Sequence, residues 1–174
     1  MKIALISSAL NVEDSRLKEV AENLAEIFHR EKIELVTGGC AGIPEIAVRK
    51  LAQLNGVTTI FSPDPDEDSH AKREDNLPLG VASKYFHSTG FTQRSLEMLN
   101  YADSVIVVNG RMGTLSEFAV ALEEGKRVGV VTNTGGIADH LEVITKLTTK
   151  NFPGKLFFSN DVEEVINWLQ NTVQ

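Results

Sequence analysis

Short apolar runs alternate with longer amphipathic segments along this 174-residue chain. The short runs, such as Val105-Ile-Val-Val108, are typical of buried strands. In the longer segments apolar residues recur at helical spacing, as Leu17, Val20, Leu24 and Phe28 do. The pattern predicts strands at residues 3–6, 33–36, 57–61, 84–88, 105–108, 127–131 and 155–158. It predicts helices at residues 13–31, 43–54, 91–101, 113–124, 137–147 and 162–169.

Strands and helices alternate over the whole chain, and several strands are apolar on both faces. This pattern is typical of a parallel sheet covered by helices on both sides. No linker, low-complexity tract or repeat divides the chain. The sequence therefore predicts one doubly wound, Rossmann-like α/β domain over residues 1–174, with a mostly parallel sheet of about seven strands.

One segment does not fit the alternation. Residues 62–78 are polar, contain Pro63, Pro65 and Pro78, and hold six acidic residues. The segment is too long for a simple connection from strand to helix, so we predict a mobile loop over residues 62–80. Its acidic run at residues 64–68 lacks the ligand spacing of an EF-hand, which favours a solvated loop over a cation site.

Composition and net charge exclude some classes of binding partner. The formal net charge of −7 argues against non-specific binding to nucleic acid or to anionic membranes, since both need basic patches. It leaves room for a phosphorylated small ligand, which backbone N–H groups can hold locally. Cys40 is the single cysteine, and no apolar stretch approaches the ~20 residues of a membrane span. We expect a cytoplasmic protein without an internal disulfide.

Two segments share the order strand, glycine turn, helix: residues 33–45 and residues 105–117. In open α/β sheets such turns present backbone N–H groups and a helix dipole to phosphate, beyond the carboxyl ends of the strands. The glycines expected to approach a ligand there are Gly38, Gly39, Gly42, Gly110 and Gly113. These glycines can also serve tight turns and helix packing alone. Ser8 follows the first strand, where binding a ligand and capping a turn remain equally open.

The same two turns resemble those of a known family. The run Gly38-Gly-Cys-Ala-Gly-Ile-Pro-Glu45 resembles the G-G-G-x-G-I-M-E turn of the LOG-type ("lonely guy") proteins. Their wider superfamily includes molybdenum-cofactor carriers and relatives of the DNA-processing protein DprA. Asn109-Gly-Arg-Met-Gly-Thr-Leu-Ser-Glu117 resembles the family signature P-G-G-x-G-T-x-x-E. Arg94 falls where the family has the arginine of an R-K pair, and the run at residues 134–139 resembles that of short, poorly characterised members.

The resemblance implies a nucleotide phosphoribohydrolase, which cleaves a nucleoside 5′-monophosphate into a free base and ribose 5-phosphate. Glu117 and Arg94 would be catalytic, because a carboxylate can stabilise an oxocarbenium-like ribosyl cation and a guanidinium can hold phosphate. Glu45, Arg111 and Thr114 would join the glycines and Ser8 in binding the ligand. The simpler readings are a first-turn acid on the helix dipole for Glu117 and a surface ion pair with Glu97 or another acid for Arg94. Nothing here supports the older label of lysine decarboxylase, because no motif places a lysine for pyridoxal chemistry.

Three departures bear on the activity. Asn109 and Arg111 replace the proline and the second glycine of the signature, and Ser95 replaces the lysine after the arginine. They favour an alternative, a non-catalytic carrier or sensor of a nucleotide-like or molybdenum-cofactor-like ligand. A third possibility is a scaffold that keeps the fold for assembly. The resemblance further implies a homodimer or higher homo-oligomer, and we expect no cofactor.

The remaining candidates have plain structural readings. Cys40 lies in a glycine turn at a helix N-terminus and is read as a small turn residue. Trp168 is read as a core anchor for the last helix. The histidines show no metal-ligand spacing, so no metal site is expected; they are His29, His70, His87 and His140.

Overall fold

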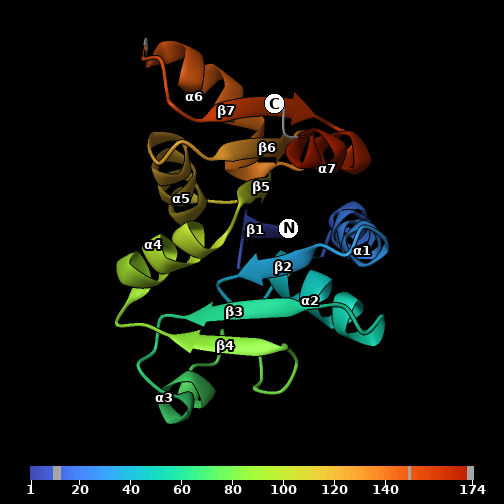
Figure 1. The fold of residues 1–174 in the computed structure, drawn as a ribbon, viewed down its shortest axis with the longest axis vertical. Coiled ribbons are helices and arrows are strands. Elements are labelled where there is room, and N and C mark those ends of the chain that lie inside the picture. Colours follow the sequence, from blue (N-terminus) through green and yellow to red (C-terminus); the bar gives the residue numbers. More distant parts are fainter. Residues whose placement is uncertain (10–12, 149, 172–174) are drawn as a thin grey trace.

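Parallel strands form a single sheet at the centre of the molecule (Figure 1). The computed structural model describes residues 1–9, 13–148 and 150–171. Within them the strands are β1 (Lys2–Ser7), β2 (Glu34–Thr37), β3 (Thr58–Ser62), β4 (Lys84–His87), β5 (Ser104–Val108), β6 (Arg127–Val131) and β7 (Lys155–Ser159). Their order is β4-β3-β2-β1-β5-β6-β7, and every neighbouring pair is parallel.

Helices cover both faces of this sheet. One face carries α1 (Ser15–Arg30), α2 (Ile43–Gln53) and α7 (Val162–Gln170), and the other carries α4 (Phe91–Tyr101), α5 (Met112–Glu123) and α6 (Leu141–Leu147) (Figure 1). A short 3₁₀ helix, η1 (Gly136–His140), precedes α6, where the pattern predicts one continuous helix. Asp139 accounts for the difference, because its carboxylate accepts hydrogen bonds from the backbone N–H groups of Thr134 and Gly135 and tightens the turn. The predicted doubly wound, Rossmann-like fold is confirmed.

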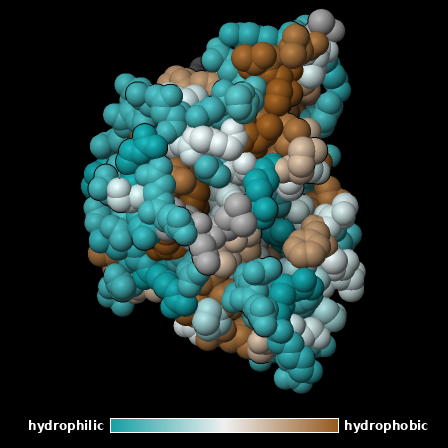
Figure 2. All heavy atoms as spheres, turned by 180° about the vertical axis from the view of Figure 1, so that it is seen from behind, coloured by the Kyte–Doolittle hydropathy of each residue, from teal (hydrophilic) through white to brown (hydrophobic). Residues whose placement is uncertain are grey.

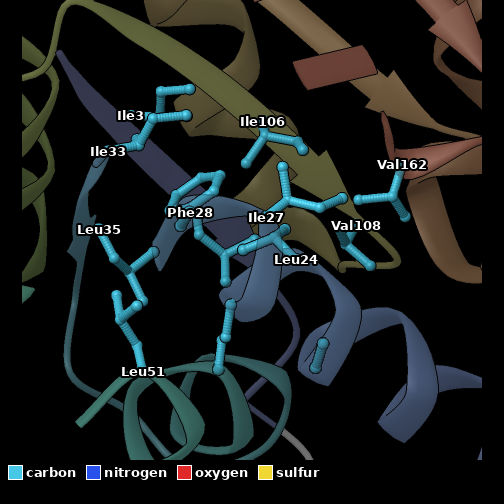
Figure 3. Packing of buried hydrophobic residues seen from close by; sticks show 14 of the residues in the cluster. Ile3, Leu24, Ile27, Phe28, Ile33, Leu35, Leu51, Ile106, Val108 and Val162 are labelled. Carbon is cyan, nitrogen blue, oxygen red and sulfur yellow. The ribbon is translucent and has the colours of Figure 1, made fainter. Parts of the chain in front are cut away.

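The hydrophobic core has two halves, one on each face of the sheet. In the half shown in Figure 3, Phe28 and Leu24 of α1 pack over Ile3, Leu35 and Ile106 of the strands. Phe28 is fully buried, and truncating such a residue to alanine costs about 3–5 kcal/mol of stability. The two packed faces hold the carboxyl ends of the strands in fixed positions.

The segment predicted as a loop over residues 62–80 contains a helix, α3 (Glu67–Lys72). It folds around a polar network. The imidazole of His70 is completely buried, with Nε2 2.8 Å from the carbonyl oxygen of Leu77, to which it donates. The carboxylate of Asp64 accepts hydrogen bonds from Arg73 at 2.6–3.1 Å and from Asn76 at 2.8 Å. The Arg73 hydrogen bonds, with a smaller contribution from Asn76, hold the pKa of Asp64 below its ordinary value.

The surface carries a band of apolar residues at one end of the molecule. Figure 2 shows it as brown spheres along the upper right, at the end that holds α6. Val143 and Leu147 of α6 are 59% and 75% exposed.

In the described part of the chain, no helix is both long enough and apolar enough to span a bilayer.

The strand order reverses between β1 and β5. After β1 the chain adds β2, β3 and β4 on one side and then returns to add β5, β6 and β7 on the other. The loops that follow β1 and β5 therefore leave in opposite directions, and a crevice opens between them. This is the place where doubly wound sheets bind their ligands.

Candidate functional site

A cavity of about 300 Å³ opens at this reversal point, beyond the carboxyl ends of β1 and β2 and beside α4 and α5. It brings together residues from both predicted glycine turns and from the helix between them. The predicted site residues that line it are Ser8, Gly38, Arg94, Arg111, Gly113, Thr114 and Glu117.

The N-terminus of α5 forms one wall. Met112, Gly113 and Thr114 are its first three residues, so their N–H groups have no partner within the helix. Gly113 exposes its backbone to the cavity, because a Cβ added there meets no protein atom within 4 Å. Gly113 and Thr114 line the cavity, so two of these N–H groups and the positive end of the helix dipole lie at it. This is the usual protein environment for a phosphate.

Thr114 connects this helix to the first strand. Its hydroxyl donates to the carbonyl oxygen of Ser7 at 3.2 Å and accepts from the N–H group of Arg111 at 3.3 Å. The side chain is 3% exposed. Thr114 therefore fixes the start of α5 against β1, and its hydroxyl is already occupied within the protein.

Arg94 of α4 lies across the end of β2. A Cβ built on Gly38 would lie 1.6 Å from Nη1 of Arg94, so the guanidinium occupies the space that a side chain at position 38 would need. The Arg94 side chain is 12% exposed. Gly38 therefore provides the slot in which this guanidinium reaches the cavity.

Glu117 of α5 faces Arg94 and has a second partner. Its Oε1 lies 3.7 Å from Nη1 of Arg94 and accepts a hydrogen bond of 2.7 Å from the hydroxyl of Ser95. The Glu117 side chain is also 12% exposed. Ser95 stands where LOG-type proteins have a lysine, and it replaces that cation with a neutral donor to the carboxylate. Of the acids considered as partners of Arg94, Glu97 instead accepts hydrogen bonds from Ser88 and Gln93, and the ion pair forms with Glu117, largely buried rather than at the surface.

Three buried polar atoms around the cavity have no hydrogen-bond partner among the described residues. They are Oγ of Ser7, Oγ1 of Thr37 and Nε of Arg94. All three residues line the cavity, and Thr37 is 1% exposed. Buried polar groups normally have partners, so these three atoms leave hydrogen-bonding capacity unused beside the cavity.

A second cavity, of about 240 Å³, adjoins the first. Arg94, Gly113, Glu117 and Phe91 line both cavities. Glu117 therefore borders both cavities.

The wall opposite α5 comes from the segment predicted as a loop. Arg73 and Asn76 line the first cavity, held in place by Asp64. Sequence reasoning did not find them, because no motif marks them. Their only signal is the long polar connection itself.

Cys40 also lines the cavity. Burial raises the pKa of its thiol above the ordinary value and outweighs the opposite effect of Arg94, which agrees with a small turn residue.

Four predicted ligand residues lie outside the cavity lining and have structural roles. Gly39 and Gly42 adopt positive φ angles of 67° and 85°, and Gly42 is the N-cap of α2. Gly110, at φ 104°, packs against the side chain of Thr114. Glu45 pairs with Arg49 one turn further along α2, at 2.8 Å. In the described ranges no group of three acidic, histidine or cysteine side chains is arranged to hold a metal ion.

The fold and the cavity define a Rossmann-like α/β protein with a cavity at the point where the strand order reverses. The chain belongs to the SLOG cluster4 family, whose model matches residues 1–166. This confirms the superfamily inferred from the two glycine turns. An uncharacterized protein of Archaeoglobus fulgidus is 26% identical over 115 residues, which are 66% of this chain and 70% of that protein.

Solved structures share the fold at low sequence identity. TM1055 has a TM-score of 0.81 and 20% identity, covering 97% of this chain and 98% of its own. The molybdenum cofactor binding protein of Rippkaea orientalis has a TM-score of 0.77 and 20% identity, covering 97% and 94%. DNA processing protein A of Helicobacter pylori, described with a single-stranded DNA binding mode, has a TM-score of 0.62 and 18% identity, covering 97% and 80%.

Proposed function

We propose that this chain binds a nucleoside 5′-monophosphate in the cavity between α4 and α5 and hydrolyses its N-glycosidic bond. The observation that carries the proposal is the pair of Arg94 and Glu117, which face each other 3.7 Å apart beside the start of α5. The products are a free base and ribose 5-phosphate. The net charge of −7 favours such a small ligand over a nucleic acid.

The phosphate is placed at the start of α5. The free N–H groups of Gly113 and Thr114 donate to its oxygens, and Arg94 adds a charged donor from α4. The unpaired atoms of Ser7 and Thr37 lie on the same floor and supply further hydrogen bonds to the phosphate or the ribose. Arg111, the N-cap of α5, adds a second guanidinium at the cavity wall.

The chemical step needs one carboxylate and one water molecule. The bond between C1′ and the base nitrogen breaks, and its electron pair leaves with the base. Glu117 stabilises the positive charge that develops on the ribose and accepts a proton from the attacking water. Glu117 then releases this proton to solvent and the departing base takes up one proton from solvent, so that the carboxylate is regenerated and the overall reaction consumes one water molecule. Ser95 orients Glu117 through its hydrogen bond to Oε1.

A second candidate is a carrier that binds a nucleotide-like ligand without cleaving it. The structural likeness to the molybdenum cofactor binding protein of Rippkaea orientalis favours it, as does Arg111, whose side chain lies where the LOG-type signature has a glycine. A carrier would use the same phosphate site. The two candidates therefore differ only in whether Glu117 acts on the ligand.

The test follows release of free base from a panel of nucleoside monophosphates by liquid chromatography, together with thermal unfolding of the protein. We expect turnover that Glu117→Gln abolishes. Glu123→Gln is the matched control, because it makes the same change on the same helix at a residue paired with Lys150 outside the cavity. Thermal stabilisation without turnover would favour the carrier, and neither effect for any nucleotide would refute both candidates.

We also propose that the chain forms a homodimer. Light scattering of the purified protein measures its mass in solution.

A further inference from the structure

Phe91 is a large aromatic residue exposed at the cavity. It is the first residue of α4, is 59% exposed, and lines both cavities beside Glu117. Aromatic side chains are normally buried, and they contribute most to binding where they remain accessible. The phosphate site at the start of α5 does not need this ring.

Two guanidinium groups lie close to the ring. Cζ of Arg73 lies 5.2 Å from the ring centroid, and Cζ of Arg94 lies 6.0 Å from it. Both groups are held by other residues, Arg73 by Asp64 at 2.6 Å and Arg94 in the slot above Gly38. The ring therefore lies near two cations that are held by the protein, within the distance at which cation–π contacts form.

Arg73 has hydrogen-bonding capacity left for a ligand. Its Nε and Nη2 donate to Asp64, and within the described ranges no hydrogen bond uses Nη1. Arg73 lines the first cavity together with Phe91. A planar group lying on the ring of Phe91 would meet this donor at its edge.

We propose that Phe91 is the surface on which the aromatic base of the ligand stacks, with Arg73 as a donor at the edge of that base. This inference rests on the proposed nucleotide site and adds the part of the ligand that is recognised away from the phosphate. Every nucleobase has a π face, so stacking on Phe91 distinguishes a nucleotide from a phosphorylated sugar and tolerates different bases. The favoured ligand class is a nucleoside monophosphate with any planar base.

The experiment compares the affinities of AMP and ribose 5-phosphate by calorimetry. Both are titrated into the full chain carrying Glu117→Gln, which prevents turnover during the measurement. We expect AMP to bind more tightly than ribose 5-phosphate. Phe91→Ala should weaken AMP binding by roughly 5- to 150-fold, the range for losing one base–aromatic stack, and leave ribose 5-phosphate unchanged. Phe91→Trp should retain the preference.

Leu96→Ala is the matched control, because Leu96 lies on the same helix, is 39% exposed and lines the second cavity without an aromatic ring. An equal loss in Leu96→Ala would overturn the stacking proposal, as would unchanged AMP binding in Phe91→Ala. Unchanged AMP binding with an altered oligomeric state would assign Phe91 to a subunit interface instead. Failure of both AMP and ribose 5-phosphate to bind before Phe91 is changed would refute the proposed function itself.

Discussion

Replacing Gly38 with alanine should damage the site without unfolding the protein. The added Cβ would lie 1.6 Å from Nη1 and 2.6 Å from Cζ of Arg94. Ordinary contact begins at 3.4 Å, so the guanidinium has to withdraw by roughly 2 Å. The backbone at position 38 is not in the left-handed region, so alanine introduces no backbone strain there. The displaced group is the far end of a flexible side chain.

The magnitudes follow from this geometry. Losing one charged hydrogen bond to phosphate costs about 1.5–3 kcal/mol, which weakens ribose 5-phosphate or AMP binding roughly 10- to 150-fold. Stability should change by less than about 1 kcal/mol, because a less flexible unfolded chain offsets the weakened ion pair. For a chain of this length that corresponds to a Tm shift of only about 2–4 °C. Calorimetric titration and thermal unfolding measure the two quantities separately.

A double-mutant cycle with Arg94→Ala tests the cause. If Gly38→Ala acts by displacing Arg94, it should have no further effect on ligand affinity once Arg94 is gone. Unchanged binding in Gly38→Ala would contradict the proposed role of Arg94. A large fall in Tm would show that the methyl group displaces the backbone instead.

Three further predictions concern other parts of the site and its supporting network. Gly113→Ala should keep or raise Tm, since its methyl group meets no protein atom, and should weaken ribose 5-phosphate binding; unchanged affinity would move the phosphate away from α5. Ser95→Ala should lower kcat roughly 10-fold with little effect on KM, because it removes the donor to Glu117, and Ser95→Thr should restore kcat; equal losses in both variants would refute the positioning role. The pKa of Asp64 lies below its value in the unfolded chain, so its contribution to stability is present above about pH 4 and is lost as pH falls through the folded-state pKa. Asp64→Asn should therefore flatten the acid limb of the unfolding free energy measured in urea, and an unchanged limb would contradict this assignment.

The fold was predictable because strand burial and helix amphipathicity are local properties of the sequence. The predicted strand at residues 105–108 differs by one residue from β5, and the predicted helix at residues 91–101 coincides with α4. Both elements are bounded by polar or glycine residues next to continuous apolar or periodic stretches. Hydrophobic burial alone therefore decided their place in the fold.

The candidate site was predictable only in part, because its contacts join residues far apart in the sequence. The glycine pattern at residues 110–113 predicted the start of α5, which forms one wall of the cavity. The fit of Arg94 over Gly38 depends on how α4 crosses the end of β2, and no local pattern encodes that crossing. Arg73 lines the cavity because a polar network, which includes its hydrogen bond to Asp64, stabilises a segment with few apolar residues. The contacts of such a network cannot be predicted from the sequence, because its residues follow no periodic pattern.

The turn after β5 shows what Asn109 does in place of the proline of the LOG-type signature. Asn109 has a φ of 56°, which proline cannot adopt and asparagine tolerates. Its N–H group donates to the Thr134 hydroxyl at 2.8 Å, a bond that proline cannot make, and its side chain accepts from the N–H of Gly110 at 2.6 Å. Gly136 fits against this turn so closely that a Cβ there would lie 2.4 Å from the carbonyl oxygen of Gly110. Residues 109–110 and residues 134–136 are thus joined by hydrogen bonds and packed closely together. Asn109 thus adopts a conformation and makes a hydrogen bond that proline cannot, while Gly113 and Thr114 of the following helix line the cavity, so the substitution does not oppose the proposed phosphate site.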